Sequence, residues 1–286
     1  MGKKLGSFLL VLFFAACITV LISIMPKFLS QMDAYQLAFW TCIFIFIPLN
    51  IIHLFVRAFG IRLKNTGSIL ISLGASLFLF GGFAFFALSV SSIGFNSSLA
   101  LVMLFPFLFL IVVPLITKES INAAQVVGII LTAAGAFCIL YARGLVNPGS
   151  WESISYVIGA AACWTVFSLL ALKTKAGIHT NVYIYVVVGL IASTIVMFIQ
   201  SSFILPEYSN LFTLLAFGAL AATIIYLWAG TFRISSASFW ASMVFILPAV
   251  ILSYELIFKS ASLPVMGIIG LGITGLAVIY RLSIKM

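Results

Sequence analysis

Charged residues are the scarcest class in this sequence. They make up 7% of its 286 residues, whereas hydrophobic residues make up 64%. A soluble domain carries roughly 25% charged residues, because its surface must be wetted by water. The low charge excludes an ordinary soluble domain, and we expect lipid to surround the chain.

Residues that could carry out catalysis or bind a metal are also scarce. The chain contains five acidic residues and two histidines, and no acidic residue lies near the middle of an apolar segment. Metal-assisted hydrolysis needs clustered histidine and acidic ligands, and a serine protease needs a base beside its serine. His53 and His179 lie at the ends of apolar segments with no acidic residue nearby in the same segment. These absences disfavour an intramembrane enzyme, and we expect no catalytic residue, no cofactor and no bound metal.

Cysteine is rare as well, and its positions argue against a disulfide-stabilised domain. The four cysteines are Cys17, Cys42, Cys138 and Cys163. Each lies inside an apolar segment rather than in a connection. They predict neither a disulfide framework nor a metal cluster.

Long apolar runs are what the sequence has in abundance. About 20 apolar residues cross the hydrocarbon core of a bilayer. The runs are continuous, whereas strands of a membrane barrel would alternate over about ten residues. The connections are too short to hold a soluble domain. We therefore predict an all-α integral membrane protein with ten transmembrane helices, at 5–25, 34–56, 67–89, 94–116, 121–142, 151–172, 181–203, 210–230, 235–257 and 263–282.

The net charge of +9 is distributed unevenly between the connections. Counted from a cytoplasmic N-terminus, the outer side holds only Lys27, Arg143 and Lys259. The inner side holds eleven basic residues: Lys3, Lys4, Arg57, Arg62, Lys64, Lys118, Lys173, Lys175, Arg233, Arg281 and Lys285. Inner connections of membrane proteins are enriched in lysine and arginine. We therefore predict a multi-pass protein of the cytoplasmic (inner) membrane with both termini cytoplasmic, and no nucleic-acid partner.

Short matches between the two halves indicate an internal repeat. They occur in the same order, at offsets between 139 and 146 residues: "AACITV" at 15–20 with "AACWTV" at 161–166, "LGA" at 73–75 with "FGA" at 217–219, "VSSIGF" at 90–95 with "ISSASF" at 234–239, and Val126 to Tyr141 with Val265 to Tyr280. They predict a five-helix repeat over 1–143 and a second over 151–286. Because five is odd, the second copy starts on the opposite side of the membrane. Such inverted repeats around a central cavity underlie alternating access.

Two apolar runs, at 99–120 and 241–260, are interrupted by proline, and they carry a family resemblance. Each combines a mid-run proline (Pro106, Pro248), an acid near its end (Glu119, Glu255) and a following glycine-bearing helix. With ten helices and the five-plus-five repeat, the chain resembles EamA-type permeases of the drug/metabolite transporter superfamily. The resemblance implies that helices 1, 3, 4, 6, 8 and 9 surround a cavity for a small metabolite.

Uncharged groups at membrane depth are the candidate cavity residues, because charged groups are lacking there. They are Trp164 and Ser168 in the sixth helix, Trp240 and Ser242 in the ninth, and Asn96 and Ser98 at the start of the fourth. They could bind a ligand by stacking and hydrogen bonds. The alternative is purely structural, since serine often joins helices and tryptophan often lies in interfacial belts. The phenylalanines, Phe109 among them, are expected to face lipid.

Pro106 and Pro248 are the candidate hinges. A proline inside a helix removes one backbone hydrogen bond, which kinks the helix or frees a carbonyl group. We interpret both positions as kinks that could also act in gating.

The sequence as a whole predicts a permease that moves a small metabolite by alternating access. An amino acid or similar zwitterion is the first candidate substrate, because the cavity is expected to be neutral and aromatic. S-adenosylmethionine or another nucleoside-like metabolite is the alternative. A channel or a structural membrane protein is less well supported, since neither needs an inverted repeat. The expected partners are the small-molecule substrate and the lipid bilayer, and the sequence leaves monomer and homodimer open.

Overall fold

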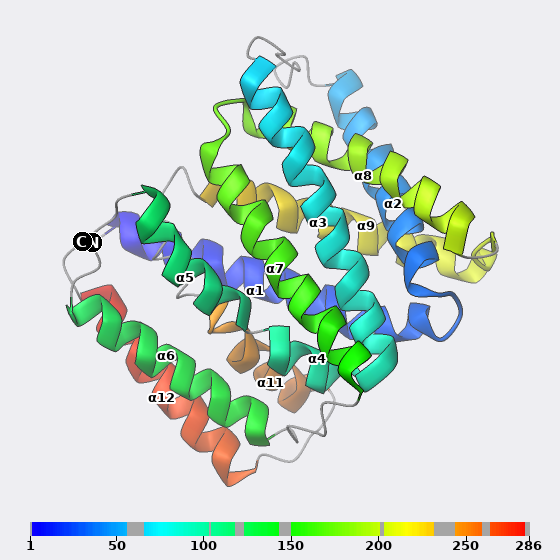
Figure 1. The fold of residues 1–286 in the computed structure, drawn as a ribbon. Helices are drawn as coiled ribbons and strands as arrows, with labels where there is room; N and C mark the ends of the chain where they lie inside the picture. The colour runs from blue at the N-terminus through cyan, green and yellow to red at the C-terminus, as the bar shows by residue number, and fades with distance from the viewer. Residues whose placement is uncertain are drawn as a thin grey trace.

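The computed structural model describes residues 2–55, 66–102, 104–117, 123–142, 150–200, 203–231, 244–258 and 264–283. Within these ranges the chain is helical and contains no strand. A backbone in lipid must satisfy its polar groups within its own segment, and a helix does this. The predicted all-α class is therefore confirmed for the described residues (Figure 1).

The described helices follow the predicted segments along the chain. In order they are α1 (Gly2–Leu29), α2 (Ala34–Phe55), α3 (Thr66–Ile93), α4 (Phe95–Val102), α5 (Leu104–Thr117), α6 (Ala123–Ala142), α7 (Trp151–Lys173), α8 (Ile178–Gln200), α9 (Leu211–Thr231), α11 (Leu247–Phe258) and α12 (Val265–Ser283), with a 3-10 turn η2 (Tyr208–Asn210) before α9.

Six helices in the described ranges are long and apolar enough to cross a membrane. Their candidate spans are Gly6–Leu29, Ala34–Ile51, Thr66–Ile93, Trp151–Lys173, Ile178–Gln200 and Tyr208–Gly230. The other predicted spans coincide with shorter helices. The segment 94–116 is described as α4 and α5, and 235–257 is described only from Val244 onward. The ten-helix inverted repeat stays a prediction.

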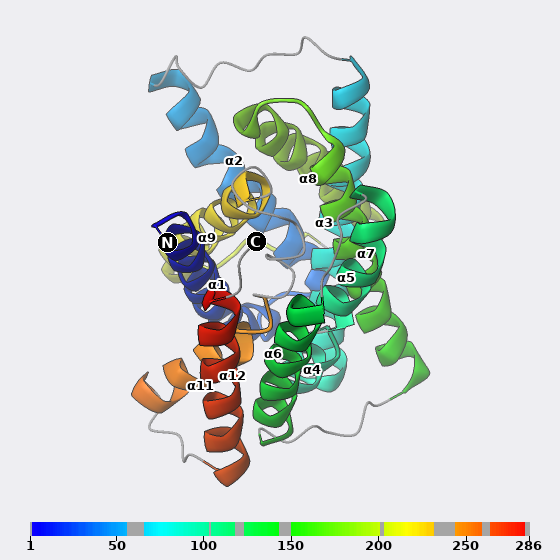
Figure 2. The same ribbon diagram turned by 90° about the vertical axis from the view of Figure 1, so that its left-hand side faces the viewer.

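Helices from the two halves of the chain pack against each other. α3 lies along α7 and also contacts α8, while α2 packs on α8 and α9, and α1 packs on α9. α6 and α12 form a separate pair at one edge (Figures 1 and 2). The start of α1 and the end of α12 lie at the same end of the bundle in both views. Which side of a membrane that end faces stays a prediction.

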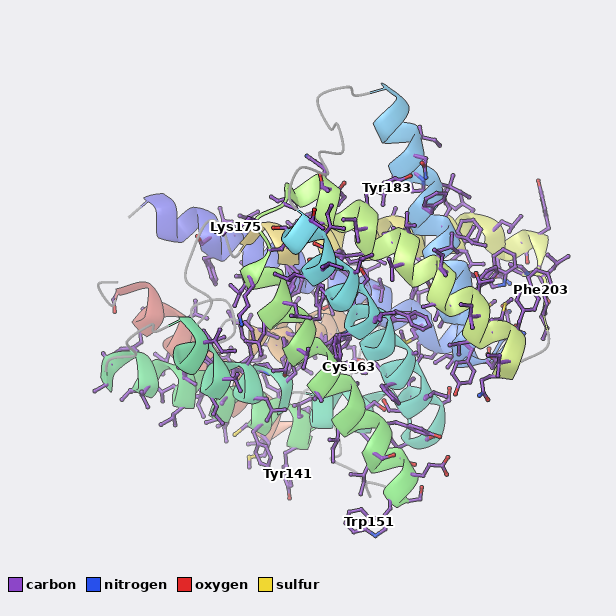
Figure 3. The ribbon with its side chains drawn as sticks, turned by 45° about the horizontal axis from the view of Figure 1, so that its top comes forward. Tyr141, Trp151, Cys163, Lys175, Tyr183 and Phe203 are labelled. Atoms are coloured by element: carbon purple, nitrogen blue, oxygen red, sulfur yellow. The ribbon has the colours of Figure 1, made fainter. Side chains whose placement is uncertain are left out.

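Glycines permit the closest helix contacts. A Cβ atom added at Gly218 in α9 would lie 2.6 Å from the backbone carbon of Phe44 in α2. Small residues at membrane helix interfaces allow backbones to approach in this way. Large apolar side chains cover the outer surface, and Tyr141 and Trp151 project from helix ends (Figure 3).

Candidate functional site

A cavity of about 210 Å³ lies at the centre of the bundle. Its wall is built by α1, α2, α3, α4, α5, α7, α8, α9 and α11, together with Val244. A buried water molecule needs about 10–15 Å³ by the same kind of measure. The cavity therefore has room for a small organic molecule, and both halves of the chain contribute to its wall.

Trp164 in α7 lines this cavity, as predicted from the sequence. Its indole lies directly on Gly82 of α3, where an added Cβ atom would be 2.5 Å from the indole Cδ1 atom. The indole also contacts the rings of Phe86 and Phe105, at centroid distances of 5.6 Å and 6.2 Å. Glycine at position 82 therefore makes the space that the indole occupies.

Ser168 lies one turn after Trp164 and also lines the cavity. It is fully buried, and its hydroxyl oxygen accepts a hydrogen bond of 2.9 Å from the indole nitrogen of Trp228 in α9. Trp228 stacks on Phe14 of α1, with ring centroids 5.4 Å apart and an angle of 27° between the planes. This contact ties α7, α9 and α1 together at the cavity wall.

Phe105 in α5 joins the two tryptophans. Its ring lies 5.8 Å from the ring of Trp228 as well as near that of Trp164. Phe109, one turn further, lies 6.5 Å from Trp228 and is fully buried. The expectation that Phe109 faces lipid is therefore wrong, because its ring packs inside the aromatic cluster. Exposed phenylalanines do occur elsewhere, for example Phe137 on α6.

Polar atoms on the wall are few. The Thr41 hydroxyl donates to the carbonyl oxygen of Leu37 in its own helix, at 2.6 Å. The other lining residues with polar side-chain atoms include Ser168, Tyr185 and Cys42. Among the described lining residues no side chain is charged. In the described ranges no group of three or more histidine, cysteine or acidic residues is placed to hold a metal ion.

The other predicted cavity residues are placed less favourably. Trp240 and Ser242 lie outside the described residues. Asn96 lies in the first turn of α4, and its side chain also lies outside the described part. Ser98 is buried, and its hydroxyl donates to the carbonyl oxygen of Gly94 at 2.9 Å. This hydroxyl group is therefore hydrogen-bonded at the start of its own helix, and Ser98 is absent from the described cavity wall.

Gly94 makes the sharp connection between α3 and α4. Its φ angle is +77°, in the left-handed region that residues with a side chain rarely adopt. Its N–H donates to the carbonyl oxygen of Val90 at 3.0 Å. The connection brings Leu99 and Val102 of α4 to the cavity wall.

Both predicted hinge prolines lie near the start of a described helix, Pro106 as the third residue of α5 and Pro248 as the second residue of α11. Pro106 is buried in α5, directly after the cavity residue Phe105. Pro248 was expected inside a continuous helix, but α11 begins at Leu247 and places this proline in its first turn. The N–H groups of Ala249 and Val250 both donate to the Ile246 carbonyl oxygen. A proline in the first turn removes no helical hydrogen bond. A role in gating stays a prediction for both.

Trp228 is the main cavity residue that sequence reasoning missed. Its signal is the spacing of Ala221, Ile224, Ile225 and Trp228, which all line the cavity from one face of α9. This spacing is that of a helical stripe. The stripe is hard to recognise in the sequence because the lipid-facing side of α9 is equally apolar.

Comparison with known proteins adds two findings. Residues 5–141 match the model of the EamA-like transporter family. In the search of solved structures 28 chains match, and one, from a crystal structure, has a TM-score of 0.78 at 16% sequence identity, over 96% of this chain and 97% of its own. This likeness shows a shared fold. No curated protein matches the sequence.

Proposed function

Because the chain belongs, through residues 5–141, to the EamA-like transporter family of the drug/metabolite transporter superfamily, we propose that it is a permease. It moves a small metabolite through the central cavity by alternating access. The observation that carries this proposal is the cavity itself, which lies between helices of both halves and is lined from each.

The proposed mechanism uses the inverted repeat expected from the sequence, with halves 1–143 and 151–286. Exchange of the conformations of two inverted halves turns an outward-open cavity into an inward-open one. Pro106 lies beside the cavity residue Phe105, so a conformational change of α5 at this proline would move a residue of the cavity wall. Both termini are proposed to face the cytoplasm, in the inner membrane.

The proposed substrate is an amino acid or similar zwitterion with a large apolar side chain. Such a side chain fits a wall of phenylalanine and tryptophan rings, and the ammonium group can lie over an indole face. The hydroxyl groups of Ser168, Thr41 and Tyr185 are the oxygen groups in the described wall. S-adenosylmethionine is disfavoured, because its ribose and adenine would need more hydrogen-bonding partners than these.

Uptake by proteoliposomes tests this proposal. The full chain is reconstituted and offered labelled phenylalanine, leucine, serine, glutamate and S-adenosylmethionine, with protein-free liposomes as the blank. We expect saturable uptake of phenylalanine and leucine that exceeds uptake of serine and glutamate. Uptake equal to the blank for the whole panel would reject the substrate class. Preference for glutamate or S-adenosylmethionine would reject the apolar cavity as its basis.

A further inference from the structure

Two polar clusters join the halves of the chain. The first lies where α3 begins and α7 turns into α8. The Ser72 hydroxyl on α3 donates to the amide oxygen of Asn181 on α8 at 2.9 Å, and the Thr174 hydroxyl donates to the same oxygen at 3.2 Å. The backbone N–H of Lys175 donates to the Ser68 hydroxyl at 3.2 Å. We name Ser68, Ser72, Thr174 and Asn181 the α3 cluster.

The side chains of the α3 cluster are mostly buried. Ser68, Ser72 and Asn181 are buried. The Asn181 amide oxygen lies within hydrogen-bond distance of two hydroxyl groups, those of Ser72 and Thr174, and the Ser72 hydroxyl also lies 2.9 Å from the Ser68 carbonyl oxygen of its own helix. Only the loss of both the Ser72 and the Asn181 side chains therefore removes this contact between α3 and α8. The cluster therefore holds α3 firmly against the connection between α7 and α8.

The second cluster lies where α1 turns into α2 and α9 begins. The amide nitrogen of Asn210 donates to the side-chain oxygen of Gln31 at 2.9 Å, and Asn210 is buried. The connection between α8 and α9 also contacts α2, because the Trp40 indole nitrogen donates to the carbonyl oxygen of Ile204 at 3.2 Å and the rings of Trp40 and Phe203 lie 5.7 Å apart. We name Gln31, Trp40, Ile204 and Asn210 the α9 cluster.

The two clusters lie at opposite ends of α8. Asn181 is in the first turn of α8, and Ile204 follows its last residue, Gln200. A helix of 23 residues is about 35 Å long. Figure 3 shows this separation, with Lys175 beside one end of α8 and Phe203 beside the other.

The cavity lies between the two clusters. On α8, the lining residue Tyr185 follows Asn181 by one turn. On α1, the lining residue Met25 precedes Gln31. Each cluster is therefore placed between the cavity wall and one end of the bundle.

The clusters are also related by the repeat expected from the sequence. At the offsets of 144 and 146 residues found there, Asn210 corresponds to Thr66 at the start of α3, and Gln31 corresponds to Gly177 in the connection between α7 and α8. Each cluster thus joins the start of a third helix of one repeat to the first connection of the other.

We infer that the α3 cluster and the α9 cluster are the two latches that close the opposite ends of the cavity. The inference rests on the proposed alternating access, because such a cycle must release one end while the other stays closed. Both latches are engaged in this structure. Each transition of the cycle then breaks the hydrogen bonds of one cluster only.

The test uses the full chain with Cys17, Cys138 and Cys163 replaced by alanine, which leaves Cys42 on the cavity wall as the thiol. A membrane-impermeant methanethiosulfonate is applied from one side at a time, and modification of Cys42 is followed by mass spectrometry. Ser72→Ala with Asn181→Ala should raise the labelling rate about five- to thirtyfold from the side of the α3 cluster alone. Gln31→Ala with Asn210→Ala should raise it from the opposite side alone.

Matched controls separate latching from general packing. Ser89→Ala removes another buried serine of α3, whose hydroxyl donates to the Phe86 carbonyl oxygen within the same helix. Ser209→Ala removes an exposed neighbour of Asn210. Neither control should change labelling from either side.

A crosslink tests the same latch without weakening the fold. Ser72→Cys with Asn181→Cys, oxidised by copper phenanthroline, should block labelling of Cys42 from the side of the α3 cluster, and dithiothreitol should restore it. Rates equal to those of the controls in both double variants would overturn the inference, as would an equal rise from both sides. Labelling needs no transported substrate, so latches can fail while uptake is observed, and uptake can fail while the latches respond.

Discussion

Two helix pairs of this bundle, α3 with α7 and α6 with α12, use glycine for different purposes. Both join a helix of the predicted first half to one of the second. α3 and α7 run past each other in opposite directions, with Gly74 near Leu170, Gly82 near Trp164 and Phe85 near Gly159. Each of these glycines makes room for a side chain of the facing helix. One of those side chains, Trp164, lines the cavity.

In the α6–α12 pair, glycine lets the backbones of the two helices approach each other closely. A Cβ atom added at Gly135 would lie 2.8 Å from the backbone nitrogen of Thr274, and one added at Gly270 would lie 2.8 Å from the carbonyl oxygen of Gly135. None of the described residues of this pair lines the cavity. Its outer side exposes large apolar groups such as Ile130 and Leu276.

The difference teaches which substitutions should affect stability and which should affect binding. Where glycine meets backbone, an added side chain has nowhere to go, because backbone atoms cannot move aside without shifting a helix. Where glycine meets an indole, an added methyl group moves the indole. Substitutions in the α6–α12 pair should therefore change the free energy of unfolding, and substitutions in the α3–α7 pair should change substrate binding in the cavity.

The largest expected effect is that of Gly135→Val in the α6–α12 pair. The new side chain collides with the backbone of α12, and we expect a loss of about 3 kcal/mol in the free energy of unfolding, the upper end of usual overpacking costs. Denaturant unfolding in detergent micelles measures it. Gly272→Val on α12 is the control, because an added Cβ atom there meets nothing within 4 Å. Equal stability of the two variants would contradict the backbone contact.

Trp164→Ala should have the largest effect on binding. A contact between a ligand ammonium and an indole in a desolvated site contributes about 2 kcal/mol, so the half-saturation constant of uptake should rise roughly thirtyfold. Phe137→Ala is the control, because this ring is 62% exposed on α6. If both variants give the same constant, the substrate does not contact Trp164.

Much of the fold could be predicted from the sequence, because long apolar runs in lipid have few alternatives to helices. The boundaries are accurate where a polar signal marks them, as at Asp33, whose carboxylate accepts hydrogen bonds from the N–H groups of Tyr35 and Gln36 at the start of α2. They are less accurate at Pro248, because a mid-run proline alone does not tell a kink from a new helix start.

The candidate site was predicted only in part. Trp164 and Ser168 were found because a tryptophan and a serine at mid-depth stand out in an apolar helix. Phe109 was misplaced and Trp228 missed, because in membrane helices the inward and outward faces are equally apolar. Hydrophobic periodicity therefore carries little information about which side chains reach the cavity.

Gly82→Ala tests the contact between α3 and the Trp164 indole from the α3 side. The added methyl group would lie 2.5 Å from the indole of Trp164, so the indole must move while it stays present. We expect a rise of about tenfold in the half-saturation constant, which corresponds to about 1.4 kcal/mol and is smaller than for Trp164→Ala. Gly74→Ala on the same helix is the control, since its nearest neighbour, Leu170, would lie 3.7 Å away. Equal constants for Gly82→Ala and Gly74→Ala would mean that the position of the indole does not matter.

The smallest expected effect is that of Ser168→Ala, which removes the acceptor of the Trp228 indole hydrogen bond. A neutral hydrogen bond contributes about 1 kcal/mol, so the half-saturation constant should rise about fivefold. Trp228→Phe keeps an aromatic ring but removes the donor, and the two changes should be less than additive because each breaks the same bond. Thr165→Ala is the control, since this hydroxyl on α7 donates to the Ala161 carbonyl oxygen within the helix. Fully additive effects of Ser168→Ala and Trp228→Phe would mean that the two residues act on the substrate independently.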